Sequence, residues 1–146
     1  KALSDLQLEC REVTTGKDIT VKTMPCRVQT MERPAEDVMV LKLKLPTNER
    51  LQFLAGQYIN ILLKDHKPRS FSLANAPHTD ELLELHIRNI VGGEFTKHVF
   101  EEMKESDILR FKGPIGTFFL REDSEKPILF VASGTGFAPI KAIIEH

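Results

Sequence analysis

The sequence of 146 residues has no tryptophan, a single tyrosine and only two cysteines, and its formal net charge is −1. Because acids and bases are interspersed, there is no basic patch for a nucleic acid and no polybasic anchor for a membrane surface. The longest apolar run, Ile128 to Ala132, is far too short to span a bilayer. We therefore expect a globular, cytoplasmic protein with a packed core and without nucleic-acid or membrane partners.

The two cysteines, Cys10 and Cys26, lie far apart in the sequence and lack the C-x-x-C spacing. They are too few to build a zinc or iron–sulfur site, so we expect no metal in this chain. The simplest interpretation is that both are free thiols, packed as small apolar side chains.

Short strand-like segments dominate the chain up to Asp123. The clearest alternation is in Val38 to Leu45, where Leu41, Leu43 and Leu45 share one face and lysines occupy the other. Many short strands with frequent turn signals predict a six-stranded antiparallel barrel, so the fold class is mainly β. The predicted strands are Asp5–Cys10 and Asp18–Lys22 near the N-terminus, then Cys26–Glu32, Val38–Leu45, Gln57–Leu63, Arg69–Ala74, Leu83–Ile90 and Asp107–Lys112, the last ending at Gly113-Pro114.

One helix is predicted within the barrel region, from Phe95 to Lys104, because Phe95, Val99 and Met103 form a helical apolar stripe. The pattern changes after Asp123. Pro127 to Ala132 is a continuous apolar run, typical of a strand buried on both faces of a parallel sheet. A glycine turn and a helix from about Ala138 follow.

This last segment predicts the first βα unit of an α/β domain. The chain begins at Lys1 without a methionine and stops at His146 within the predicted helix, so we interpret it as a piece of a longer protein. The apolar side chains Ile128, Phe130, Ile140 and Ile143 would then lack sheet and helix partners. We expect this tail to be disordered, or to bury itself against the barrel or a second copy, as self-association.

The segment Arg69-Ser70-Phe71-Ser72 combines a guanidinium, a flat aromatic ring and small hydroxyls. A guanidinium matches phosphate oxygens two at a time, and an aromatic ring can stack on a flat cofactor. On a regular strand Arg69 and Phe71 point to one face and Ser72 to the other. Read singly, these residues are a surface arginine, a core phenylalanine and a surface serine; read together they indicate a nucleotide cofactor with a redox ring.

The segment Gly92-Gly93-Glu94-Phe95-Thr96 lies at the start of the predicted helix. Two glycines let the backbone approach a ligand, and we expect Thr96 to cap or open a helix whose free N–H groups favour a pyrophosphate. Arg88, upstream, adds a second possible phosphate charge. Taken alone, the segment is equally well an ordinary strand-to-helix turn.

The sequence Gly134-Thr135-Gly136, followed by Pro139, comes directly after the apolar run. Many α/β turns are rich in glycine, so this motif is weak by itself. It is not the full dinucleotide fingerprint, because proline rather than glycine occupies position 139; proline instead suits the first turn of a helix.

In this order the motifs resemble those of the ferredoxin–NADP⁺ reductase-like flavoproteins. The family's Arg-x-Tyr/Phe-Ser and Gly-Gly-x-x-Ser/Thr motifs are similar to Arg69–Ser72 and Gly92–Thr96. Further similarities are Gly56-Gln57-Tyr58 at a strand entrance, Gly113-Pro114-Ile115-Gly116-Thr117-Phe118 as the linking motif, and Gly134–Pro139 on the nicotinamide side. The resemblance is greatest to reductases with an N-terminal plant-type [2Fe–2S] ferredoxin domain, whose last strand resembles residues 1–9.

The resemblance implies FAD as cofactor, NAD(P)H as substrate and a [2Fe–2S] cluster in the part of the longer protein that precedes this chain. It implies a ferredoxin remnant and linker over residues 1–23, a flavin-binding barrel over 24–123 and the truncated start of a nicotinamide-binding domain over 124–146. The implied FAD-binding residues are Arg69 on the pyrophosphate, Ser70, Phe71 stacked on the ring, Ser72 near N5 as the catalytic residue, His86, Ile87 and Arg88 along the adenosine diphosphate, and Gly92, Gly93 and Thr96. The implied nicotinamide-nucleotide residues are Gly134, Thr135, Gly136 and Pro139.

The implied activity is hydride transfer from NAD(P)H to FAD, followed by release of single electrons to an iron–sulfur centre. Within the family, the sequence is most similar to reductases of deoxysugar synthesis, and reductases of aromatic-ring oxygenases share the architecture. Two alternatives stay open: a plain flavin carrier that only relays electrons, and a non-redox module that binds a nucleotide or a partner protein.

Overall fold

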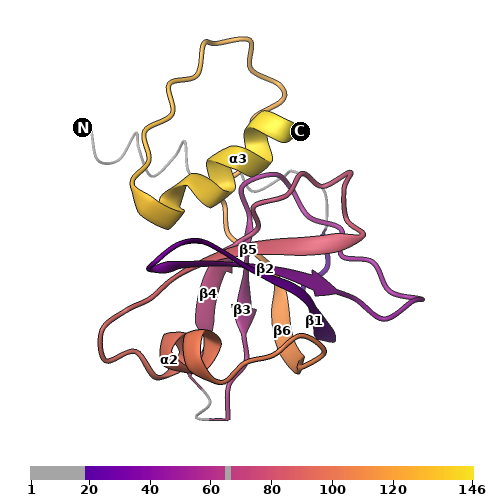
Figure 1. The fold of residues 1–146 in the computed structure, drawn as a ribbon. Coiled ribbons are helices and arrows are strands. Elements are labelled where there is room, and N and C mark those ends of the chain that lie inside the picture. Colours follow the sequence, from indigo (N-terminus) through magenta and orange to yellow (C-terminus); the bar gives the residue numbers. More distant parts are fainter. Residues whose placement is uncertain (1–18, 65–66) are drawn as a thin grey trace.

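The computed structural model describes residues 19–64 and 67–146, and it confirms the mainly β fold class. Six antiparallel strands form one sheet with the order β4-β3-β6-β1-β2-β5 (Figure 1). The strands and helices are β1 (Lys22–Ala35), β2 (Val38–Lys44), β3 (Tyr58–Ile61), β4 (Arg69–Ser72), β5 (Leu82–Arg88), α2 (Glu94–Glu101), β6 (Ile108–Ile115) and α3 (Phe137–Glu145), with a short 3₁₀ turn at Gly134–Gly136 before α3.

The two outermost strands of this order meet just beyond the end of β4, and this contact nearly closes the sheet into a barrel. Leu73 forms a β-bridge with Leu85 of β5. The backbone N–H of Ala74 then donates to the carbonyl of Glu84 at 2.9 Å. Closure protects strand edges that would otherwise expose unpaired backbone groups.

The core lies inside the barrel and comes from the alternation seen in the sequence. Leu41 and Leu43 of β2 are fully buried and face Leu85 and Leu83 of β5 in the antiparallel register. Phe111 of β6 is likewise fully buried. Each strand thus contributes every second side chain to one apolar interior.

Helix α2 packs against one end of the barrel, next to β4 (Figure 1). Phe95 and Val99 are buried, as the helical stripe predicted. The helix ends at Glu101, earlier than the predicted Lys104. The carbonyl of His98 accepts from the N–H groups of both Glu102 and Met103, and this shared acceptor closes the last turn.

The predicted end of the sixth strand at Gly113-Pro114 was wrong. Strand β6 continues to Ile115, because Gly113 still pairs with Lys22 of β1 and Ile115 pairs with Tyr58 of β3. The glycine has a packing reason: a Cβ at position 113 would lie 2.6 Å from Cγ2 of Ile59. Only glycine lets β6 pass β3 this closely.

The strand predicted over Pro127–Ala132 was also wrong. These residues form no strand, and Ile128, Leu129 and Val131 are exposed. A central parallel strand needs neighbours on both sides. The part of the chain that the structure describes supplies no such neighbours, so the apolar run stays unpaired.

The following helix is confirmed, and it lies across the barrel beside β5 (Figure 1). Ala142 and Ile143 of α3 pack with Ala55, and Leu120 and Phe130 join this small apolar cluster. The expectation that the tail buries itself against the barrel is therefore confirmed for only part of its apolar side chains. Ile140 and Ile143 are buried, whereas Ile128 stays exposed.

The N-terminal predictions fall mostly outside the described residues. The strand over Asp5–Cys10, the thiol of Cys10 and most of the domain over 1–23 lie there. Residues 19–21 are not in a strand, and β1 begins only at Lys22. Cys26 is a buried free thiol, as predicted. The proposed domain limits at 23 and 123 stay predictions.

Neither of the described ranges, 19–64 and 67–146, contains a helix long and apolar enough to cross a membrane.

The contact between α3 and the barrel can be tested by placing a charge at Ala142, which is fully buried. Ala142→Asp should detach α3, because a buried carboxylate without a partner costs several kcal/mol. We expect faster proteolysis and faster amide exchange over residues 137–145, with the barrel still folded. The control is Ile144→Asp on the exposed side of α3, which should change neither; equal effects of the two variants would contradict the packing described here.

Candidate functional site

The predicted cofactor strand β4 turns two of its side chains toward the core and two away from it. In the pairing with β3, Phe71 faces Ile59 and Arg69 faces Ile61, and both isoleucines are fully buried. Directly opposed residues project to the same side of a sheet. Arg69 and Phe71 therefore share one face, as the sequence predicted.

Phe71 also contacts the first turn of α2. Its ring lies 5.5 Å from the ring of Phe95, with 43° between the ring planes. This contact brings the segment Arg69–Ser72 next to the glycine loop Gly92–Thr96. Two motifs separated by a strand and a turn in the sequence thus form one site.

The two serines of β4 lie on the other side of the strand. Ser70 donates through Oγ to Oδ1 of Asn60 at 2.7 Å, and Ser72 faces Tyr58. The hydroxyl of Ser70 is therefore engaged within the sheet. Ser72 lies on the opposite face from Phe71, so a cofactor contacted by the Phe71 ring would meet Ser72 through its backbone or at the strand edge.

The guanidinium of Arg69 stays at the partly exposed end of β4. Its Nη1 donates to the carbonyl of Lys67 at 2.9 Å. This bond holds the side chain near the strand end, where it is accessible to a ligand. A guanidinium carries five N–H donors in a planar fork, a geometry that matches phosphate oxygens.

The glycine loop before α2 needs both of its glycines, for different reasons. Gly92 has a φ of +79°, and a Cβ there would meet nothing within 4 Å. Gly93 is crowded instead: a Cβ would lie 2.7 Å from Oγ1 of Thr96 and 3.1 Å from the carbonyl oxygen of Ile90. Gly92 thus provides open space beside the helix, and Gly93 lets the loop close against it.

The expectation that Thr96 caps α2 was wrong. The N-cap is Gly93, without a side-chain cap bond, and Thr96 lies one turn later with little exposure. Its Oγ1 accepts from the N–H of Ile90 at 3.2 Å and lies 3.2 Å from the carbonyls of Ile90 and Gly93. Thr96 therefore ties the loop together, and its hydroxyl is already engaged inside the protein.

These features fit a pyrophosphate at the start of α2. The first N–H groups of a helix have no partner inside the helix and carry partial positive charge. The open side of Gly92 gives an anion access to them, and Arg69 lies on the adjoining strand. The arrangement thus has the donors and the space that a dinucleotide phosphate needs.

The three predicted residues of β5 are in different environments. Ile87 is fully buried in the core, so only its backbone can reach a ligand. The Nε2 of His86 donates to Oε1 of Glu84 at 2.8 Å. Arg88 is exposed and donates through Nε to Oδ2 of Asp37 at 2.9 Å.

The Gly134–Gly136 turn lies beside β5, which the sequence did not predict. Gly134 has a φ of +55°, and a Cβ there would lie 3.6 Å from Nη1 of Arg88. Pro139 lies in the first turn of α3, as expected. The structure therefore brings Arg88, predicted on the flavin side, next to the turn predicted on the nicotinamide side.

Sequence reasoning missed Lys141 altogether. Its Nζ lies 3.3 Å from Oε1 of Glu84 and donates to the carbonyl of Ala74 at 3.2 Å. Glu84 and Ala74 were not predicted as site residues either. An ion pair between a helix and a strand far apart in sequence leaves no periodic signal, so no pattern could have revealed it.

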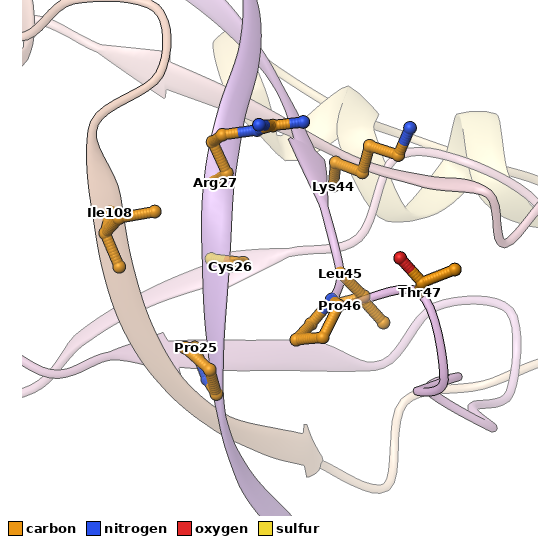
Figure 2. Close-up of a pocket in the computed structure, with 8 residues that line it drawn as sticks. All are labelled: Pro25, Cys26, Arg27, Lys44, Leu45, Pro46, Thr47 and Ile108. Carbon is orange, nitrogen blue, oxygen red and sulfur yellow. The ribbon is translucent and has the colours of Figure 1, made fainter.

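Two pockets among the described residues are lined by none of the predicted cofactor residues. The first, of about 370 Å³, opens between β1, β2 and β6. Figure 2 shows Arg27 and Lys44 projecting beside it from neighbouring strands. Another, of about 400 Å³, is lined by Lys42, Glu84 and Lys141 under α3.

No group of three or more possible metal ligands occurs among the described residues. Cys26 is not available as a ligand, because burial raises its pKa to about 12 and keeps the thiol protonated.

The role of Thr96 as a tie within the loop gives a testable difference. Thr96→Val keeps the shape but removes the hydroxyl, so it should lower the free energy of unfolding by about 1–3 kcal/mol, since it leaves the Ile90 N–H unsatisfied. Thr96→Ser keeps the oxygen and should lose less. Urea unfolding of both variants measures this, and a loss in Thr96→Ser as large as that in Thr96→Val would contradict this role of the hydroxyl.

Glu84 gives a prediction for pH. The hydrogen bond from His86, with a further contribution from Lys141, lowers the pKa of Glu84 to about 2. Because the pKa is lower in the folded protein than the ordinary value of 4.5, the stabilisation is complete above that value and is lost as pH falls toward about 2.

The difference in unfolding free energy between the wild type and Glu84→Gln should therefore be large at neutral pH and shrink steadily below pH ~4.5. Urea unfolding at several pH values measures it, with the exposed Glu105→Gln as control. A difference that does not change with pH would contradict the assignment.

Comparison with known proteins identifies the family of the barrel. Residues 25–120 match the family of oxidoreductase FAD-binding domains. The CDP-6-deoxy-L-threo-D-glycero-4-hexulose-3-dehydrase reductase of Yersinia pseudotuberculosis is 44% identical over 99% of this chain and 44% of its own length. The reductase component of the naphthalene 1,2-dioxygenase system of Pseudomonas putida, a ferredoxin–NAD(P)⁺ reductase, is 33% identical over 97% of this chain and 47% of its own length.

Among solved structures, a cytochrome P450 reductase of Amycolatopsis superposes with a TM-score of 0.81 at 30% identity, covering 88% of this chain and 40% of that one. The chain spans less than half of the length of the relatives it matches. The family match begins at Pro25 within β1 and covers the rest of the barrel, including β4 and the glycine loop. The chain therefore belongs to the oxidoreductase FAD-binding domain family.

Proposed function

We propose that this chain is the flavin-binding part of an NAD(P)H-dependent reductase that passes single electrons to an iron–sulfur centre. The observation that carries the proposal is the contact of Phe71 with Phe95, 5.5 Å between ring centres, which joins the β4 motif to the glycine loop. One guanidinium, one aromatic ring and one helix N-terminus then serve a single ligand.

The names of the relatives support the reaction. One is a reductase that acts with a ferredoxin and NAD(P)⁺, and another is a reductase of a deoxyhexulose dehydrase. The higher identity to the second, 44% against 33%, favours a role in deoxysugar synthesis over a role in oxidation of aromatic rings. The final electron acceptor is an iron–sulfur protein or domain on either path.

Each residue of the site has a proposed task in holding FAD. Arg69 binds the pyrophosphate together with the N–H groups at the start of α2. Phe71 offers its ring to the flavin, and Gly92 leaves room for the phosphates. When bound, FAD supplies the ability to accept a hydride and to release electrons one at a time.

Other residues act on that site from a distance. Thr96 keeps the glycine loop closed, and Ser70 keeps β4 paired to β3 through Asn60. These contacts lie within the protein, and direct contacts of Thr96 and Ser70 with FAD stay predictions. Ile87 supports the site from the core, and Arg88 lies between the flavin side and the Gly134–Gly136 turn.

The proposed contact for the nicotinamide nucleotide is the Gly134–Gly136 turn, which includes Thr135, together with Pro139. It opens α3, so the first N–H groups of that helix are oriented for a phosphate. The cytoplasmic location and self-association through the C-terminal unit stay predictions.

A non-redox module that binds a nucleotide or a partner protein is the alternative. Absorbance separates the two, because the purified reductase should carry the yellow colour of bound flavin. Reduction of that flavin by NADH or NADPH then separates a reductase from a plain flavin carrier.

Arg69→Ala should weaken FAD binding by at least about tenfold, because a hydrogen bond to a charged group contributes roughly 1.5–3 kcal/mol. Titration of the apoprotein with FAD, followed by flavin fluorescence, measures the change. Arg110→Ala on the outer face of β6 is the matched control and should bind FAD like the wild type. Unchanged affinity in Arg69→Ala would refute the assignment of this residue.

Ser72→Ala should slow reduction of the flavin by NAD(P)H more than it weakens FAD binding. The reason is the position of Ser72 next to Phe71 on β4, at the strand edge where a small donor can reach the flavin ring. Stopped-flow reduction of the whole reductase decides, with the loop serine variant Ser124→Ala as control. A normal rate with weakened FAD binding would make Ser72 a binding residue only.

A further inference from the structure

Lys141 lies at the centre of the contact between α3 and the barrel. Its Nζ lies 2.9 Å from Oε1 of Glu145, 3.2 Å from the carbonyl oxygen of Ala74 and 3.3 Å from Oε1 of Glu84. An ammonium group has three donors, and these three acceptors can use all of them. Only Glu145 belongs to α3 itself, so two of the three contacts join the helix to the barrel.

Both barrel partners of Lys141 lie where the sheet closes. Ala74 follows β4 by two residues, is fully buried, and donates its N–H to the carbonyl of Glu84. The N–H of Glu84 in turn donates to Oδ1 of Asn75 at 2.9 Å. The carbonyl that Lys141 binds is therefore part of a rigid backbone segment that continues directly from the flavin strand.

The side chain of Glu84 is held from several directions. On β5 it accepts from His86, and across the strands Lys42 of β2 lies opposite it in the register. Burial by itself lowers the pKa of Lys141, but the bonds to Glu145 and Glu84 outweigh it and raise the pKa. Lys141 thus stays charged, and its partner Glu84 is only 15% exposed, so the pair is worth more than a surface ion pair.

The apolar part of the interface cannot by itself fix the position of α3. Ala142 and Ile143 pack against Ala55, and such contacts are not directional. A helix held only by them can slide or rotate at small cost. Charge-assisted hydrogen bonds to a backbone carbonyl and a carboxylate select one rotation and one axial position.

The position of α3 sets the position of the turn before it. The Gly134–Gly136 turn leads directly into α3, and Gly134 lies beside Arg88 of β5. A shift of the helix would therefore move this turn relative to β4 and β5 together. Lys141 lies one helical turn beyond Phe137, where it can control that shift.

We propose that Lys141 is a positioning residue, which holds the Gly134–Gly136 turn in register with the flavin strand by bridging Ala74 and Glu84. This inference rests on the proposed function, because it assigns the turn to the nicotinamide nucleotide and β4 to the flavin. Lys141 then sets the position of the nicotinamide-nucleotide turn relative to the flavin site on β4.

The test uses the reductase that contains this chain, with FAD bound, and the variant Lys141→Met. Methionine keeps the apolar stem and removes the charge and the donors. We expect FAD affinity to stay unchanged, and the rate of flavin reduction at saturating NAD(P)H to fall about tenfold or more, since small misplacements of reacting groups have large effects. Lys141→Arg keeps charge and donors and should stay nearer the wild type.

A second measurement does not depend on activity. Amide hydrogen exchange over residues 134–145 should become faster in Lys141→Met, whereas exchange in β1 and β2 should stay the same. The matched control is Lys22→Met, which removes an exposed ion pair to Glu49 of 3.8 Å on another part of the barrel. It should alter neither the reduction rate nor exchange near α3.

The outcomes separate this inference from the proposed function. A wild-type protein that binds FAD but is reduced by neither NADH nor NADPH would overturn the proposed function, and the role of Lys141 with it. A reducible wild type with an equal rate in Lys141→Met would overturn the role of Lys141 alone. A parallel loss of FAD affinity, folding stability and rate would also overturn it, because it would make Lys141 a structural residue.

Discussion

The rest of the structure depends on the closure of the sheet between the end of β4 and β5. Leu73 pairs with Leu85, and Ala74 donates to the carbonyl of Glu84, so the first and last strands of the sheet order are joined. This junction fixes the direction of β4, which carries Arg69 and Phe71. It also presents the carbonyl of Ala74 on the outside of the barrel. The same backbone junction therefore holds β4 in place and provides a carbonyl against which α3 packs.

The second constraint is the close fit of the glycine loop. Gly93 fits only without a side chain, because Thr96 and Ile90 occupy the space around it. The hydroxyl of Thr96 then holds the loop in a form that leaves its outer side open at Gly92. A loop whose conformation is already fixed before binding loses little conformational entropy when an anion binds. Thr96 therefore shapes the proposed phosphate site from inside the protein.

The sequence predicted the barrel well, because inward and outward side chains alternate with a period of two. Leu41, Leu43 and Leu45 are buried as their spacing requires. Local sequence patterns gave wrong strand limits where pairing with segments distant in the sequence decides whether a strand forms. Strand β6 passes through Gly113 because β1 and β3 pair with it there, and Pro127–Ala132 is not a strand because no neighbours pair with it in the described part of the chain. The shared face of Arg69 and Phe71 was predictable, but the contacts of Lys141 were not, because they join segments that only the fold brings together.

The position of Tyr58 has a consequence for spectroscopy. It is the single tyrosine of a chain without tryptophan, and it lies directly opposite Ser72 in the pairing of β3 with β4. Near-ultraviolet absorption and emission of this chain therefore come almost entirely from one ring on the strand next to the proposed flavin site. A flavin bound on β4 would lie close enough to accept excitation energy from that ring. Loss of tyrosine emission would then report occupancy of the site without any introduced label.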